Sequence, residues 1–167
     1  MSRLLDAYET VVSPSYRLLG LIDTSVDPYG LDPDDGHWLL SVPGLVYLQV
    51  PSQVIEAVVR LENWSNLPPE TDARWFGREE VEVDLPGGEL GIHTIDGGVQ
   101  QVPNILSSPG RYKMRWQWMF NGTRGPFVSP LSWHPLEIPP ECEEELNGKE
   151  QYCLVQMWRI SADVKVE

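Results

Sequence analysis

The sequence contains no long hydrophobic run and no segment typical of a secretory leader. No stretch approaches the roughly 18 apolar residues that a membrane-spanning helix needs. Residues 1–10 carry two acidic side chains and no apolar run, unlike a signal peptide. Cysteine is scarce, with only Cys142 and Cys153, and without an export signal we expect two reduced thiols rather than a disulfide. These features predict a soluble cytoplasmic protein.

Positive charge is also scarce. The 167 residues include 12 Lys plus Arg against 25 Asp plus Glu, a formal net charge of −13. A chain this acidic is repelled by phosphate backbones and anionic lipid. We therefore expect no direct binding to nucleic acid or membranes, and attraction to proteins with a basic surface.

Helical periodicity is almost absent. No window of about eleven residues keeps a 3.6-residue hydrophobic period without an interrupting Pro or Gly. Fifteen Pro and fourteen Gly separate short apolar runs, a spacing typical of sandwiches and barrels. The sequence predicts an all-β protein, a single-domain antiparallel β-sandwich over residues 1–167 with long acidic and Pro-rich loops.

The clearest strand is Arg111–Phe120, where every even position from Tyr112 is apolar and the odd positions to Gln117 are polar. This alternation predicts that Tyr112, Met114, Trp116 and Trp118 face the core. Near the C-terminus the predicted strand is apolar on both faces, which indicates a central strand or one covered by a loop. The remaining predicted strands are Gly44–Val50, Val54–Glu62, Glu79–Leu85, Leu90–Ile95, Gln151–Ile160 and two weaker ones between Glu9 and Asp23.

Two segments are too polar and too often interrupted by Pro to belong to a core. Asp23–Gly36 holds five Asp, and the extended segment 126–150 is rich in Pro and Glu. Both are predicted to be surface loops. The second also holds Phe127 and Trp133, so we expect part of it to pack back on the sandwich.

The sequence contains few residues in the patterns that catalysis or metal binding requires. His37, His93 and His134 are far apart and lack the short spacings of a zinc site. The run 32–36 fails the calcium-loop pattern, and no nucleophile motif or phosphate-binding loop is present. We expect no cofactor, no metal and no enzymatic activity, with His93 as a hydrogen-bonded histidine of a sheet.

The aromatic residues in loops and at strand ends leave two alternatives. They could cap the ends of the sandwich, which we favour, or form a protein-binding rim beside acidic residues. The residues predicted to bind a partner are Asp32, Asp34, Asp35, Trp38, Trp75, Trp133, Glu143, Glu144 and Glu145. A competing hypothesis is a ligand-binding or enzymatic cleft lined by Trp38, Trp75, His93 and Trp133.

Four motifs resemble a group of small, uncharacterised β-sandwich proteins from actinobacteria. They are Val42–Leu48, Glu79–Val83, Pro109–Arg115 and Gln151–Trp158. More remotely, the pattern is similar to the bacterial competence protein that inhibits a DNA-entry nuclease. The resemblance implies a fold and carries no catalytic residues. Together with the charge, it implies a non-enzymatic inhibitor or immunity protein for a basic, nucleic-acid-processing partner.

Overall fold

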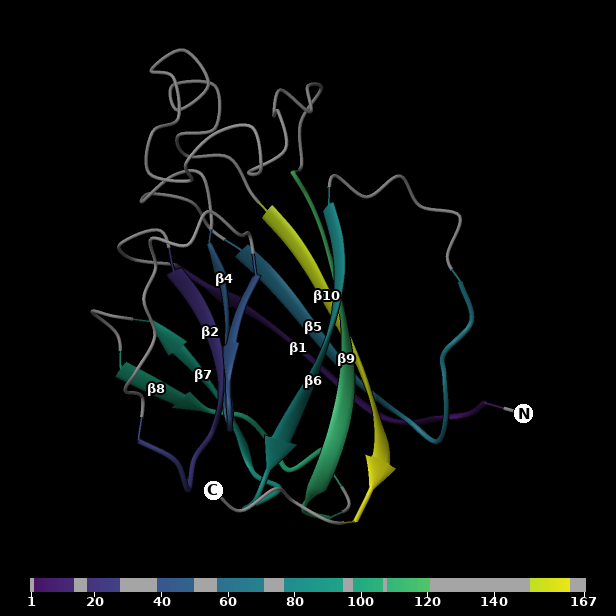
Figure 1. Cartoon of the computed structure of the whole chain (residues 1–167). Helices are drawn as coiled ribbons and strands as arrows, with labels where there is room; N and C mark the ends of the chain where they lie inside the picture. The colour runs from purple at the N-terminus through teal and green to yellow at the C-terminus, as the bar shows by residue number, and fades with distance from the viewer. Residues whose placement is uncertain are drawn as a thin grey trace.

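The chain folds as two five-stranded sheets packed face to face (Figure 1). The computed structural model describes residues 2–13, 18–27, 39–49, 57–70, 77–94, 98–106, 108–120 and 151–162, and these contain no helix. Sheet A has the order β1 (Leu4–Val12), β5 (Ala57–Trp64), β10 (Gln151–Ser161), β9 (Gly110–Phe120), β6 (Gly77–Leu85). Sheet B has the order β3 (Leu39–Val42), β4 (Leu45–Gln49), β2 (Leu18–Asp23), β7 (Leu90–Thr94), β8 (Gly98–Gln101). The predicted β-sandwich is confirmed.

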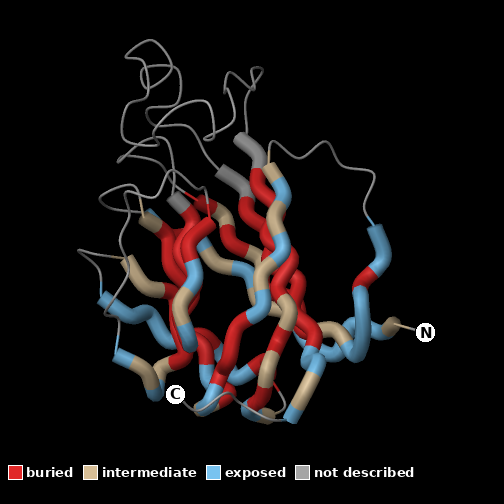
Figure 2. The backbone as a smooth tube through the Cα atoms, viewed as in Figure 1, coloured by how far each residue is buried: buried red, intermediate tan, exposed pale blue. Residues whose placement is uncertain are grey.

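The core lies between the sheets, as the buried strands of Figure 2 show. The prediction for β9 is confirmed, because Tyr112, Met114, Trp116 and Trp118 are all buried in the core. Cys153 of β10 is fully buried as a free thiol, and burial raises its pKa. No helix long and apolar enough to cross a membrane occurs in the described ranges.

One pair of strands departs from the predicted antiparallel pattern. β5 pairs with β10 in parallel, while β10–β9 and β9–β6 are antiparallel. β5 and β6 therefore run in the same direction, two strands apart, and no hairpin can join them. Their connection must cross a face of sheet A, and its described part lies on the outer face, where the Pro68 carbonyl accepts a hydrogen bond from Arg115 of β9.

Two strands, β3 and β8, were not predicted. β3 is only four residues long, and all four residues of β8 are exposed, so β8 has no alternation to detect. Ile160, predicted on a buried side of β10, is 43% exposed because it lies at a register irregularity near the end of the strand.

Asp23, predicted within an acidic surface loop, is instead completely buried at the end of β2. Its carboxylate accepts hydrogen bonds from the amides of Ser25, Gly87 and Gly88, and from the Ser25 hydroxyl at 2.6 Å. A Cβ at position 87 would lie 2.7 Å from that carboxylate, which explains the glycine there. Asp23 thus fastens sheet B to the turn that follows β6 of sheet A.

Candidate functional site

The strand ends that are nearest in sequence to the predicted partner-binding residues lie together at one end of the sandwich. We call it the loop end: β3, β5, β6 and β10 begin there, and β4 and β9 finish there (Figure 1). The register agrees, because Gln151 pairs with both Ala57 and Phe120, and Gly77 pairs with Trp118. The opposite end, with Asp23 and the β6–β7 turn, is the turn end.

All nine predicted partner-binding residues lie outside the described residues, as do His37, His134 and Cys142. In sequence, Trp38 directly precedes β3, and Trp75 lies two residues before β6. The segment that joins β9 to β10 holds Trp133 and Glu143–Glu145. Their predicted role in binding a partner therefore stays a prediction.

The acidity is unevenly distributed between the sandwich and the other segments. The described residues include eleven acidic and seven basic side chains, a balance of −4, so −9 of the total −13 falls elsewhere. The segment 121–150 alone has six Glu against two basic residues, and 28–38 has three Asp and no Lys or Arg. The sandwich is thus much closer to neutral than the segments that adjoin its strands.

The outer face of sheet A holds a buried polar network that the sequence pattern did not predict. Gln156 lies at its centre, 2% exposed. Its amide nitrogen donates to Glu62 Oε1 at 3.0 Å. Its amide oxygen accepts from Gln117 Nε2 at 3.1 Å and from Arg115 Nη1 at 3.3 Å. The only sign of this network in the sequence was the presence of polar residues on the outward side of β5, β9 and β10, which the structure shows to be central strands.

Glu62 of β5 is surrounded by donors. Arg60 Nε lies 2.9 Å from its Oε2, and Trp64 Nε1 lies 3.0 Å from its Oε1. Burial alone would raise the pKa of Glu62, but the hydrogen bonds from Gln156, Arg60 and Trp64, with the charge of Arg60, hold it below its ordinary value. Glu62 is therefore a carboxylate engaged by its neighbours, with little capacity to act as an acid or base.

Arg115 links the network to the β5–β6 connection. It is 1% exposed, its Nε donates to Glu80 Oε1 at 3.2 Å, and its guanidinium lies 5.7 Å from the centre of the Trp158 ring. Glu70 of the connection lies 3.6 Å from Arg115 and pairs with both terminal nitrogens of Arg78. These contacts hold the connection against the sheet.

His93 is hydrogen-bonded within its sheet, as predicted. Its Nδ1 contacts the hydroxyl of Tyr47 on β4, and the two rings meet edge to face with centroids 5.6 Å apart. Burial lowers the pKa of His93 and raises that of Tyr47 to about 12. The other three residues of the hypothetical ligand cleft, Trp38, Trp75 and Trp133, lie outside the described residues.

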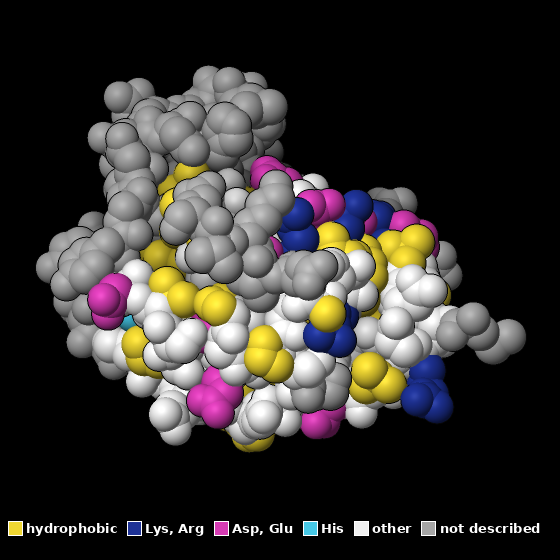
Figure 3. Space-filling model, turned by 60° about the horizontal axis from the view of Figure 1, so that its bottom comes forward, with side chains coloured by type: hydrophobic (Ala, Val, Ile, Leu, Met, Phe, Trp, Pro, Cys, Tyr) yellow, Lys and Arg dark blue, Asp and Glu magenta, His cyan; other side chains and the backbone are white. Residues whose placement is uncertain are grey.

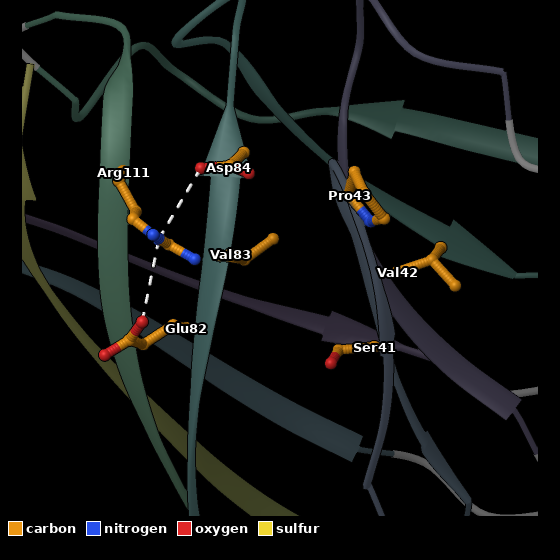
Figure 4. A pocket seen from close by; sticks show the side chains of 7 residues that line it. All are labelled: Ser41, Val42, Pro43, Glu82, Val83, Asp84 and Arg111. Carbon is orange, nitrogen blue, oxygen red and sulfur yellow. Dashed lines mark ion pairs between the residues drawn. The ribbon is translucent and has the colours of Figure 1, made fainter. Parts of the chain in front are cut away.

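Pockets of about 230 and about 200 Å³ lie in the described part of the molecule. The larger lies between the β3–β4 turn and β6, and Figure 4 shows Arg111 directed toward Glu82 and Asp84 at its wall. Arg111 Nε lies 3.6 Å from Glu82 and 3.7 Å from Asp84, so the wall holds one basic side chain between two carboxylates. Across the described ranges, no group of three His, Cys, Asp or Glu side chains could hold a metal ion.

Comparison with known proteins shows a likeness of fold. No family model matches the chain, and no curated protein matches its sequence. Among solved structures, the chain is similar to ComJ of Bacillus subtilis, an inhibitor of the DNA-degrading activity of NucA. That match has a TM-score of 0.59 and 12% identity, and covers 96% of this chain and 99% of ComJ. A second match, named crocagin biosynthetic gene J, has a TM-score of 0.46 and 20% identity, and covers 92% and 97% of the two chains.

The likeness to ComJ agrees, at the level of fold, with the remote resemblance noted in the sequence. No family model supports the resemblance to actinobacterial β-sandwich proteins.

Proposed function

We propose that this chain is a non-enzymatic protein-binding module that restrains a basic, nucleic-acid-processing partner, as an inhibitor or immunity protein does. The observation that carries the proposal is the uneven distribution of negative charge, with −9 in the segments between the described ranges and −4 within those ranges. A concentration of negative charge attracts a basic protein and accelerates its association. A nucleic-acid enzyme needs a basic surface to approach phosphates, and an acidic module can cover that surface.

The fold supports the same proposal. ComJ, which shares the fold over nearly its whole length, is an inhibitor of a DNA-degrading protein. Because one fold hosts many functions, this likeness supports the proposal only together with the charge. In the larger of the described pockets, the charged groups Glu82 and Asp84 are both engaged by Arg111.

We propose that the partner contacts the loop end. Trp38 and Trp75 adjoin strands that begin there, and aromatic residues bury much area at low entropic cost. The acidic residues would bring the partner in, namely Asp32, Asp34, Asp35, Glu143, Glu144 and Glu145.

The experiment is capture from the lysate of the source organism, followed by an assay of DNA degradation. The immobilised chain should retain a basic protein at low salt and release it at high salt. The eluted protein should degrade DNA, and adding back the free chain should stop that degradation. A captured protein whose DNA degradation the chain does not affect would contradict the inhibitor role.

A matched pair of variants separates local charge from total charge. One carries Asp32→Asn, Asp34→Asn and Asp35→Asn. The control carries Asp6→Asn, Glu9→Gln and Glu89→Gln, three exposed acidic residues of the sandwich. Both lose three negative charges, and only the first should lose inhibition. If no protein is captured and a small molecule raises the Tm instead, the ligand-binding alternative is favoured.

A further inference from the structure

Exposed hydrophobic side chains gather on sheet A near the turn end. Leu4 is 39% exposed, Leu67 is 54% exposed and Ile160 is 43% exposed. Figure 3 looks onto this end and shows hydrophobic side chains at several places, including the right of the molecule, where charges of both signs lie beside them. Isolated exposed apolar residues are ordinary, but a group of them on one surface indicates an interaction site.

The strand register brings these residues together. Leu4 of β1 is opposite Trp64 of β5, and Trp64 is opposite Trp158 of β10. Ile160 follows two residues after Trp158, and Leu67 follows three residues after Trp64. Two hydrogen bonds between Arg3 and Ser65 fasten the start of β1 to the turn that leads to Leu67. We call the group Leu4, Trp64, Leu67 and Ile160 the apolar patch.

The charges on the outer face of sheet A are paired, unlike those of the chain as a whole. Arg60 pairs with Glu62 at 2.9 Å, Arg78 with Glu70, and Lys113 with Glu80 at 3.7 Å. The basic side chains of β5, β6 and β9 thus offset acidic ones on the same face. A basic partner would be drawn to the acidic segments, whereas this face attracts neither sign of charge strongly.

From these observations we propose that the apolar patch is a self-association surface, which binds a second copy of this chain across a two-fold axis. Such an interface needs one surface that complements itself, and an apolar centre with paired charges of both signs meets that condition. Two chains of −13 repel each other, and they approach at lowest cost through the face where charge is balanced. This goes beyond the proposed function and leaves the loop ends of both copies free.

Sedimentation of the purified full chain tests the proposal. From about 1 µM to about 1 mM, the wild type should pass from monomer to dimer. The dimer should tighten between about 0.05 M and about 0.5 M NaCl, because salt screens the repulsion between the two chains. Capture of a basic partner should weaken over the same range, so the two kinds of binding are distinguished by opposite salt dependence.

The variant Leu67→Glu with Ile160→Glu should weaken the dimer at least about tenfold. Val99→Glu with Gln101→Glu is the matched control, because it adds the same two charges at exposed positions of β8 in the other sheet. Leu4→Glu provides a second disruption of the patch should the double variant fold poorly, with Val99→Glu alone as its control. A monomer at every concentration and salt would overturn the proposal, as would a dimer that tolerates the patch variants as well as it tolerates the controls.

Discussion

Arg115 and Lys113 occupy the same face of β9, two residues apart, in opposite surroundings. The Arg115 side chain is 2% exposed and touches Glu80, Gln156 and the Pro68 carbonyl. The Lys113 side chain is 37% exposed and makes an ion pair with Glu80 at 3.7 Å. A buried charge that loses its partner is costly, whereas an exposed ion pair contributes little.

Arg115→Ala should therefore lower the free energy of unfolding by about 2–5 kcal/mol, because it truncates a fully buried side chain and removes its hydrogen bonds to Gln156, Glu80 and the Pro68 carbonyl. Lys113→Ala should cost less than about 1 kcal/mol. Urea unfolding of both variants, monitored by Trp fluorescence, measures the difference. Similar losses in the two variants would contradict the role given to Arg115.

Glu62 should make stability depend on pH in the acid range. Its pKa is lower in the folded chain than the ordinary value of 4.5, so the carboxylate stabilises the fold above that value. This contribution should disappear as the pH falls through the lower, folded pKa. Between about pH 7 and about pH 3, Glu62→Gln should lose less stability than the wild type. Parallel losses in the two proteins would exclude this contribution.

Cys153 should be inert in the folded chain. It is fully buried, and burial raises its pKa, so the thiolate that reacts with disulfide reagents is scarce. In a Cys142→Ser variant, an aromatic disulfide reagent should find no fast-reacting thiol in native protein and one after unfolding. A rapid reaction in the native state would show that the core around β10 opens readily.

Asp23 acts at the scale of elements, because it joins the end of β2 to the turn between β6 and β7. Asp23→Asn replaces one of the two acceptor oxygens with an NH₂ group, so that either the Ser25 donors or the Gly87 and Gly88 amides lose their acceptor, at a cost of about 1–3 kcal/mol. Asp27→Asn, an exposed residue four positions later, should cost less than about 0.5 kcal/mol. Thermal unfolding of the two variants provides the comparison, and equal shifts in Tm would contradict the anchoring role.

The sequence predicted the strands that can be recognised from the pattern of neighbouring residues. Strand β9 can be predicted because Tyr112, Met114 and Trp116 alternate with polar residues and a turn precedes the strand. Strand β10 was predicted to be central or covered by a loop, and both are found: it lies between β5 and β9, and the β5–β6 connection crosses the outer face of its sheet. These features follow from alternation over a few residues.

What escaped prediction depends on contacts between distant residues. The parallel pairing of β5 with β10 joins residues about 94 positions apart, as in the hydrogen bond of Gln156 to Glu62. The burial of Arg115 follows from that pairing, because it forces the connection to cross the outer face. Asp23 looked like a loop acid because nothing in its neighbours reveals that Gly87 and Gly88 donate to it.

At the scale of the whole molecule, the sequence predicted the negative charge of the candidate site but not its geometry. Composition gives −13, and the structure places −4 of it in the described residues. The result is a sandwich with a charge of −4, an apolar patch toward one end, and acidic segments that adjoin strands beginning at the other. We propose a different partner for each feature, a second copy at the patch and a basic protein at the loop end.

The rate of association with the basic partner that the capture experiment should yield, measured against ionic strength, tests the central claim most directly. For the wild type the rate constant should fall steeply with salt. The variant Glu143→Gln, Glu144→Gln, Glu145→Gln should associate more slowly at low salt and with a shallower dependence. The control Asp6→Asn, Glu9→Gln, Glu89→Gln, with the same change in net charge, should stay close to the wild type. Equal rates and equal slopes for all three proteins would show that the partner is not drawn to the acidic segments.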